Sequence, residues 1–374
     1  MNGGSGHSGT NNRTKVQRQH ENEWEHHMKK ILGTVAIAAL LSGPPQFASA
    51  EEVATVRINQ AFQSLLYLSL YVANDAGFFD EEGLDVKVTT GGGGSQAWSA
   101  VLGGSAEYSI HDPVFPTISR EQGGPGIVVG TICNAETIYA LAKKPDIKLT
   151  TNFEELLSKG YKISTQPQPD SGWARLTYLA QKLNIKAGDS TYTNVQVPIG
   201  SEMASVFAGQ TDIGLSYPPV VELAEEQGLH VTFSFTAASR PYLFSSLNTT
   251  QDFIEKNPET HQKVMNAFEK ASQYIYRYPE EAVKIAVKEF PDLDEKIVRK
   301  AVERMTSELA YPEHVFAEYN AFTANQKLHQ FVGTIKQPAT AEEGLNNTAA
   351  LAAYQSLGRI SWDAPRPISK TVTQ

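Results

Sequence analysis

Short hydrophobic runs alternate with segments of helical periodicity over residues 54–236. Apolar runs of about four to eight residues predict strands, whereas apolar positions three to four residues apart predict helices. The helix expected first is amphipathic and stops at Gly77. The first set of elements comprises strands at 54–61, 83–90, 106–111 and 126–133, and helices at 64–77, 95–104 and 113–123.

A second set follows the same pattern, with strands at 161–166, 193–198, 211–217 and 229–235, and helices at 152–160, 171–184, 201–210 and 218–228. From Asp252 onward the pattern is mostly helical. Pro258, Pro279, Pro291 and Pro312 are expected at helix starts, where a missing N–H costs little. Strands alternating with helices favour an α/β fold with helices on both faces of a sheet, and two such sets favour two lobes with a cleft between them.

Residues 28–50 have the pattern of a secretory signal peptide. Two lysines after Met28 precede an uncharged run of eleven residues, and Ala48-Ser49-Ala50 offers a cleavage site. The alternative is a membrane anchor, but such a run spans only about half of a bilayer core. Residues 1–27 are polar and without periodicity, so we expect them to be a non-native or misassigned extension and Met28 to be the natural start.

The composition is that of a globular protein with one large or two medium domains, since 41% of its 374 residues are hydrophobic. Its formal charge of −9, from 32 basic and 41 acidic residues, argues against nucleic-acid binding. The single cysteine, Cys133, excludes a disulfide within the chain and a cysteine-based metal site. No second run is long enough to cross a membrane, and the motifs of zinc, calcium and serine-hydrolase sites are absent from the sequence. We therefore expect no metal and no cofactor.

Six segments carry a family resemblance, in the order AGFFDEEGLDVKVTTGGGG, VLGGSAEYSIHD, KISTQ, SGWARLTYLAQKLNI, VPIGSEMASVFAGQTDIGLSYPPV and PYLFSSLNTTQDFIEKNPE, and the resemblance covers about residues 53–335. They resemble the substrate-binding proteins of bacterial ABC importers, in the group that takes sulfonates, nitrate, taurine or pyrimidine precursors of thiamine.

This resemblance implies a type II periplasmic-binding fold of class α/β, with a ligand enclosed as two lobes close. Lobe 1 would combine residues 53–141 and 237–358, lobe 2 would be residues 142–236, and residues 359–374 would form an irregular tail. The implied function is capture of a small organic anion in the periplasm and delivery to an ABC permease and its ATPase. The protein would act as a monomer, without a membrane span and without enzymatic activity.

Glycines and helix starts supply the first candidate ligand contacts, because free backbone N–H groups there favour anions. Gly93, Gly94 and Ser95 join a strand to a helix, although a plain flexible turn is the alternative. His111 could donate to an anion or a ring nitrogen, and Asp112 could cap the helix at Pro113. A structural histidine is the alternative for His111, but the family's corresponding strand often ends in a ligand contact.

The remaining candidates lie in the second set of elements and after it. Ser171 and Gly172 would offer N–H groups, while Trp173 would form a flat wall or pack in the core. Tyr217 ends a strand before two prolines, and Arg240 would neutralise an anion or lie on the surface as an ordinary arginine.

Three other functions are left open. Trp173, Tyr217 and His111 would suit a pyrimidine precursor of thiamine or another aromatic molecule, although the sequence favours an organic anion slightly. An enzyme similar to the pyridoxal-phosphate-dependent pyrimidine synthases would need a cytosolic chain, which the export signal disfavours. A sensor module without transport is the third.

Export predicts a mature protein that begins at Glu51. We expect N-terminal sequencing of the protein from a periplasmic extract to give Glu51 as the first residue. Recovery of exported protein that still carries Met1 would refute the cleavage prediction.

Overall fold

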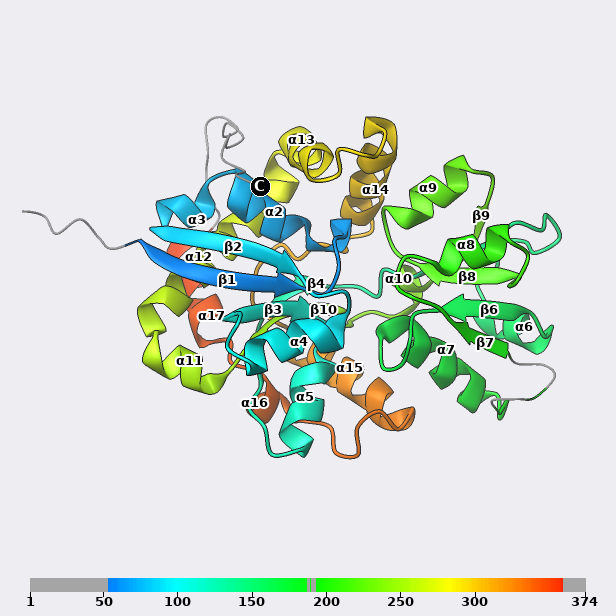
Figure 1. Ribbon diagram of the computed structural model, residues 1–374, viewed down its shortest axis with the longest axis horizontal. Coiled ribbons are helices and arrows are strands. Elements are labelled where there is room, and N and C mark those ends of the chain that lie inside the picture. The colour runs from blue at the N-terminus through cyan, green and yellow to red at the C-terminus, as the bar shows by residue number, and fades with distance from the viewer. Residues whose placement is uncertain (1–52, 187–188, 190–192, 359–374) are drawn as a thin grey trace, which may run out of the picture. The chain divides into compact units, whose positions relative to one another are not determined.

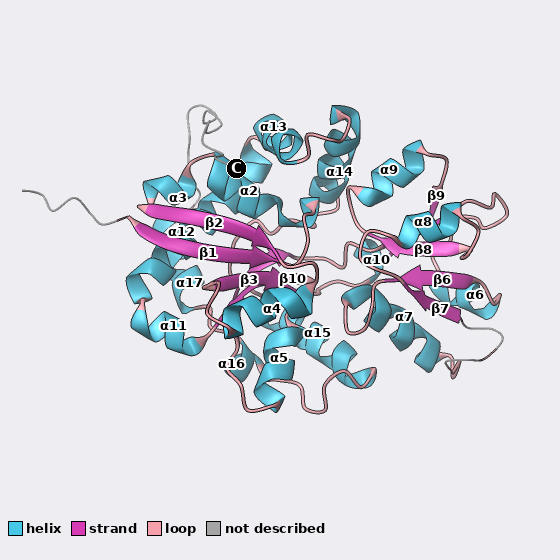
Figure 2. Ribbon diagram, in the orientation of Figure 1, coloured by secondary structure: helices cyan, strands magenta, loops and turns pink. Residues whose placement is uncertain are grey.

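The computed structural model describes residues 53–186, 189 and 193–358, so the predictions made for residues 1–27, 28–50 and 359–374 lie outside the described residues. The described part contains two five-stranded sheets with helices around them (Figures 1 and 2). This arrangement confirms the predicted α/β class. Both sheets are mixed, because each contains parallel and antiparallel pairs.

The first sheet has the strand order β2-β1-β3-β10-β4. β1 pairs in parallel with β2 and β3, whereas β10 is antiparallel to both β3 and β4. Its strands are β1 (Ala54–Gln60), β2 (Leu84–Thr90), β3 (Tyr108–His111), β4 (Ile127–Cys133) and β10 (Ser245–Thr249).

Strand β10 was missed by the sequence analysis because its sequence, SSLNT, has no apolar alternation. It is nevertheless buried along its whole length. Its polar side chains are satisfied within the sheet, since Ser246 Oγ donates to Asn248 Oδ1 over 2.7 Å and Asn248 Nδ2 donates to Ser109 O over 3.3 Å. A buried polar strand is tolerable only with such partners.

The second sheet has the order β7-β6-β8-β5-β9. β6 is parallel to β7 and β8, and β5 is antiparallel to β8 and β9. Its strands are β5 (Tyr139–Ala142), β6 (Lys162–Thr165), β7 (Thr193–Gln196), β8 (Ile213–Ser216) and β9 (His230–Ser234).

Helices cover both sheets, and seven of those described follow β10. Those between strands of the first sheet are η1 (Leu65–Tyr67), α2 (Leu68–Asp75), α3 (Phe78–Glu81), α4 (Gly94–Leu102) and α5 (Val114–Glu121). Those near the second sheet are α6 (Phe153–Ser158), α7 (Ser171–Lys182), α8 (Glu202–Phe207), α9 (Val220–Glu226) and α10 (Phe235–Ala238). The C-terminal helices are α11 (Gln251–Lys256), α12 (Pro258–Arg277), α13 (Pro279–Glu289), α14 (Glu295–Ser307), α15 (Tyr319–Phe331), α16 (Ala341–Gly344) and α17 (Thr348–Leu357).

The first helix differs from its prediction in two respects. It starts with the 3₁₀ turn η1, and α2 is buried at every residue except Asn74 rather than amphipathic. The reason is its position, because α12 and α13 pack on it from outside the sheet. A helix covered in this way has no polar face.

The proline predictions are half right. Pro258 and Pro279 open α12 and α13, as expected. Pro291 does not open a helix, because α14 starts after Asp294, whose Oδ1 accepts the Lys296 N–H over 2.9 Å. The segment after Pro312 is also not helical, since its backbone bonds to strand β4 instead, with Thr131 N donating to the carbonyl oxygen of residue 315 over 2.7 Å.

Two connections run between the sheets, residues 134–138 and residues 235–244. Glu136 in the first connection is fully buried and forms a two-point ion pair with Arg175 of α7, at 2.6 Å from Nη2 and 2.7 Å from Nε. The Arg175 guanidinium also lies over the ring of Tyr242 in the second connection, 5.4 Å from its centroid. One arginine therefore links α7 to both connections.

We expect Glu136→Gln to lower the free energy of unfolding by about 3–5 kcal/mol, because Arg175 would keep a buried charge without its counter-ion. Urea denaturation measures this difference. The control is Lys256→Gln, which breaks the exposed Lys256–Asp252 pair and should cost no more than about 1 kcal/mol. Equal losses in the two variants would contradict the role given to Glu136.

Candidate functional site between the sheets

Segments that follow strands of both sheets meet in one region, which we call the intersheet site and define by Phe62, Asp112, Asp170, Ser171 and Tyr217. Ser171 Oγ, at the start of α7, donates to Asp112 Oδ2, which precedes α5. The ring of Phe62, after β1, stacks on that of Tyr217, after β8, with 5.6 Å between centroids and 17° between planes. Each contact joins one sheet to the other.

Asp112 is the most connected side chain of this site. Its Oδ1 accepts from the Val114 N–H and from Asn325 Nδ2, each over 2.9 Å, and its Oδ2 contacts His329 Nε2 at 3.2 Å in addition to Ser171. Burial opposes ionisation, but His329 and these hydrogen bonds outweigh it, so the pKa of Asp112 lies below its ordinary value. Asp112 thus accepts the first N–H of α5, although Pro113 rather than Asp112 occupies the N-cap position, and it is an anion whose oxygens are already occupied.

His111 is held by the protein at both ring nitrogens. Nδ1 lies 2.9 Å from the carbonyl oxygen of Asp112, and Nε2 lies 2.8 Å from Ser109 Oγ. The rings of Trp98 and Phe115 meet it edge-on, at 5.8 and 5.2 Å between centroids. Burial lowers the pKa of His111 to about 4, so the ring is neutral near pH 7. This geometry favours the structural interpretation of His111, and ligand contact there stays a prediction.

The glycine turn before α4 is required mainly by packing. A Cβ on Gly94 would lie 2.2 Å from Cε2 of Phe115, so no side chain fits there. Gly93 is buried at the N-cap of α4, whereas Ser95 is exposed. A ligand role for these three residues stays a prediction, but the close contact with Phe115 explains the glycine without one.

The start of α7 has a similar constraint. A Cβ on Gly172 would lie 2.0 Å from Oε1 of Gln166, whose Nε2 donates to Glu202 Oε1 over 2.8 Å. Trp173 is half-buried and packs against the main apolar cluster, which is the second of the two interpretations given for it. Of the three residues predicted here, only Ser171 lies in a contact between the sheets.

Asp170 is one of two site residues that the sequence did not predict, the other being Phe62. It occupies the N-cap position of α7 but makes no capping hydrogen bond, and none of the described residues hydrogen-bonds its carboxyl group. Burial raises the pKa of Asp170 to about 7, and the charges of Asp112 and Glu202 add to this effect. The sequence did offer one indication of this residue, because Asp170 lies in QPQPDSGW directly before the predicted helix at 171–184.

Aromatic rings form the other wall of the site. Tyr217 is buried, and besides Phe62 it meets Phe244 at 5.8 Å between centroids. Burial, followed by the charges of Asp170 and Glu202, raises its pKa well above the ordinary value, so its hydroxyl remains a donor. Phe62 carried no sequence signal beyond following a predicted strand.

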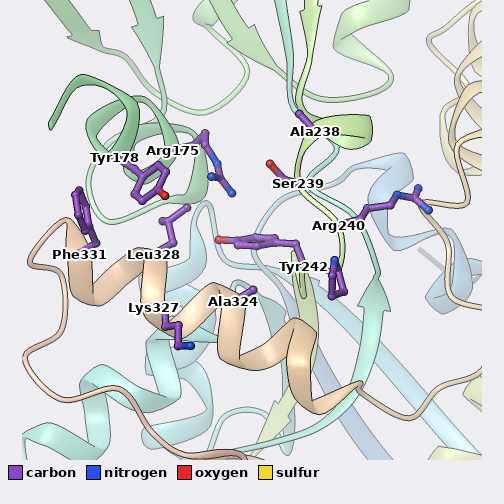
Figure 3. Close-up of a pocket in the computed structure, with 11 residues that line it drawn as sticks. Arg175, Tyr178, Ala238, Ser239, Arg240, Tyr242, Ala324, Lys327, Leu328 and Phe331 are labelled. Atoms are coloured by element: carbon purple, nitrogen blue, oxygen red, sulfur yellow. The ribbon is translucent and has the colours of Figure 1, made fainter. Parts of the chain in front are cut away.

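A cavity of about 370 Å³ lies beside the connections, between α7 and α15 (Figure 3). We call it the hinge pocket. Arg175 and Tyr242 point into it, whereas Arg240 extends away from Tyr242 in this view. Arg240 is exposed and its Nε donates to Thr236 O over 3.4 Å. The predicted cation therefore lies in the second connection, and a ligand contact for Arg240 stays a prediction.

Among the residues that the structure describes, no group of three or more histidines, cysteines or carboxylates is placed to hold a metal ion. No helix among them combines the length and apolar character that crossing a bilayer requires.

We expect Asp170→Asn to raise the melting temperature by several degrees at pH 8 and to have little effect near pH 4. A carboxyl group whose pKa rises on folding destabilises the folded state increasingly from its ordinary pKa up to about pH 7, and fully above that. Asparagine removes this cost. Calorimetric melting between pH 4 and pH 8 measures the difference.

The control for this prediction is Asp212→Asn, because the pKa of Asp212 is shifted the other way. Burial opposes its ionisation, but Lys144 and the Lys162 N–H prevail and lower its pKa. This variant should lose stability at pH 8, with the loss fading as the pH falls. A loss of stability at pH 8 in Asp170→Asn as well would contradict the assignment of Asp170 as an unpaired acid.

The chain is similar to one protein family and to several known proteins. The family model described as NMT1/THI5 like matches residues 67–282. The candidate binding protein YtlA of Bacillus subtilis is 24% identical over 269 residues, which cover 70% of this chain and 78% of YtlA. The 4-amino-5-hydroxymethyl-2-methylpyrimidine phosphate synthase of Aspergillus parasiticus is 25% identical over 248 residues, covering 63% of this chain and 70% of that protein.

Among solved structures, the periplasmic aliphatic sulphonate binding protein SsuA of Escherichia coli superposes with a TM-score of 0.64. The two are 14% identical, and the match covers 78% of this chain and 92% of SsuA. Such a likeness shows the fold. It confirms the periplasmic-binding fold expected from the sequence, and the family model confirms the expected group. The chain belongs to the NMT1/THI5-like family and has the fold of the periplasmic binding proteins of ABC importers.

Proposed function

We propose that this chain is the solute-binding component of an ABC importer, which captures a small molecule at the intersheet site and passes it to a permease and its ATPase. The family and the fold support this role. The two lobes predicted from the sequence would close on the ligand, with their boundaries at the connections between the sheets, residues 134–138 and residues 235–244. Closure on a ligand requires contacts that exist only in the closed arrangement, and both walls of the intersheet site would supply them.

The proposed ligand is a flat nitrogen heterocycle of the pyrimidine type. The observation that carries this choice is the Asp170 carboxyl group, which is half-buried, unpaired among the described residues and close to Tyr217. An N–H group or a protonated ring nitrogen would give Asp170 the partner that it lacks. An anion would instead meet Asp112, Asp170 and Glu202, whose like charges would oppose it.

The aromatic pair suits the same ligand. Phe62 and Tyr217 come from different sheets and stack in offset fashion, so a third flat ring could lie against either of them. The likeness to a pyrimidine phosphate synthase agrees with a pyrimidine, although that enzyme's reaction is a property of that enzyme.

An organic anion is the second candidate, and one observation favours it. Arg240 and Lys327 both line the hinge pocket, and the described residues give neither an acidic partner within 4 Å. A sulfonate or carboxylate could bind there, as the resemblance to sulfonate, nitrate and taurine binders implies. Arg175 contributes less, because Glu136 already neutralises it.

A thermal-shift panel tests the two candidates. It would contain aminopyrimidines, aromatic carboxylates, taurine, alkyl sulfonates, nitrate, bicarbonate and pyridoxal phosphate. A ligand at about 100 times its Kd should add about 2.7 kcal/mol, which raises the melting temperature by several degrees. We expect this shift for an aminopyrimidine, and we expect Asp170→Asn to reduce it by at least half.

Other outcomes separate the alternatives. A shift confined to sulfonates or nitrate, lost in Arg240→Ala but kept in Asp170→Asn, would replace the pyrimidine with an anion in the hinge pocket. A shift with pyridoxal phosphate would revive the enzyme hypothesis. No shift with any compound would leave the fold as described and direct attention to the sensor hypothesis.

A further inference from the structure

Six charged side chains form a ladder between α9, next to the second sheet, and α14, one of the C-terminal helices. Figure 1 shows the two helices beside each other. We call this set the charge ladder, and it comprises Glu222, Glu225 and Glu226 on α9 and Lys296, Lys300 and Arg304 on α14.

The spacing of these residues places each set on one helix face. The cations lie four residues apart on α14, and on α9 the adjacent Glu225 and Glu226 lie three and four residues after Glu222. The rungs are Lys296–Glu226 at 2.6 Å, Lys300–Glu225 at 2.8 Å and Arg304–Glu222 at 2.7 Å, with a further contact of 2.6 Å between Arg304 and Glu225. The order of rungs shows that the two helices run antiparallel.

The rungs differ in exposure along the ladder. Lys296 and Lys300 are 60% and 54% exposed, whereas Arg304 is 18% exposed and Glu222 is fully buried. Arg304 also lies over the ring of Tyr139, the first residue after the first connection, at 4.9 Å from the centroid. The inner rung is therefore near the connections between the sheets, and the outer rungs are in contact with solvent.

The two helices are fixed to different bodies. α14 is held to α13 by Arg299–Glu280 at 2.8 Å, and α13 packs on α2 of the first sheet. α9 packs on β9 of the second sheet. Any rotation of one sheet away from the other about the connections would stretch the exposed outer rungs most.

We propose that the charge ladder holds the two sheets together in the closed arrangement, so that ionic strength sets the fraction of molecules that are open. This inference rests on the proposed function, in which two lobes open and close around a solute. Exposed ion pairs act over about 10 Å at 0.1 M salt and about 3 Å at 1 M, so the outer rungs weaken as salt rises. The inner rung, with a fully buried Glu222, is screened much less.

The test measures opening without any ligand. Spin labels at Lys159→Cys, after α6, and Glu255→Cys, in α11, would report the distance between the two bodies by double electron–electron resonance. Both positions are exposed, and the native Cys133 is fully buried. In the wild type we expect a single short distance at 100 mM NaCl and an added longer distance at 1 M.

The decisive variant is Lys296→Glu with Lys300→Glu, which turns both outer rungs into repulsive pairs. At 100 mM NaCl it should raise the ratio of open to closed molecules about tenfold. The matched control is Lys256→Glu with Lys284→Glu. It makes the same change in net charge at lysines 70% and 58% exposed, each paired within its own helix.

A distance distribution in the ladder variant that superimposes on the wild type would overturn the proposal, as would an equal opening in the control. Because the measurement uses no ligand, its result is independent of the panel that tests the proposed function. If the protein opens on addition of salt but responds to no compound in the panel, the role proposed for the charge ladder would stand and the proposed solutes would be rejected.

Discussion

The contacts of the Asp112 carboxylate hold the centre of this structure together. Its four partners come from three places: the start of α5, the start of α7 and two residues of α15. Because α7 belongs to the second sheet and the others to the first, this one buried anion fixes how the sheets meet. A buried carboxylate is stable only with such partners, and breaking the set would leave a charge without compensation.

Asp170 is a second carboxyl group near the centre, but its pKa is shifted in the opposite direction to that of Asp112. The two acids lie close enough to repel each other, yet the pKa of Asp112 is lowered and that of Asp170 is raised. The difference lies in their partners, because His329, Asn325 and Ser171 all serve Asp112 and no described group serves Asp170. An unsatisfied group of this kind costs stability, and proteins retain such costs mainly where they bind or react.

Periodicity predicted most of the strands and helices from their apolar positions, but it missed β5, a buried apolar strand of four residues that is too short to show a period. It also failed where burial is achieved by hydrogen bonds, as in β10, or where a competing contact decides, as at Pro291 and Pro312. The site was harder to predict for a related reason. Asp112 and Ser171 follow from their places before helices, but whether an acid is satisfied depends on side chains distant in sequence, such as Asn325 and His329. No local pattern therefore distinguishes Asp112 from Asp170.

In the proposed closing motion, the buried contacts at the centre and the exposed contacts at the rim would have different roles. At the centre, the bond from Ser171 to Asp112 is buried and little affected by salt, so it determines which arrangement of the sheets is allowed. At the rim, the outer rungs of the charge ladder are exposed, so in the proposed mechanism they would change how populated that arrangement is without changing its geometry. A ligand at the proposed site would add its contacts to the centre alone. Its differential affinity for the closed arrangement would therefore come from the acids and rings of the intersheet site, whereas the ladder would set the equilibrium on which that affinity acts.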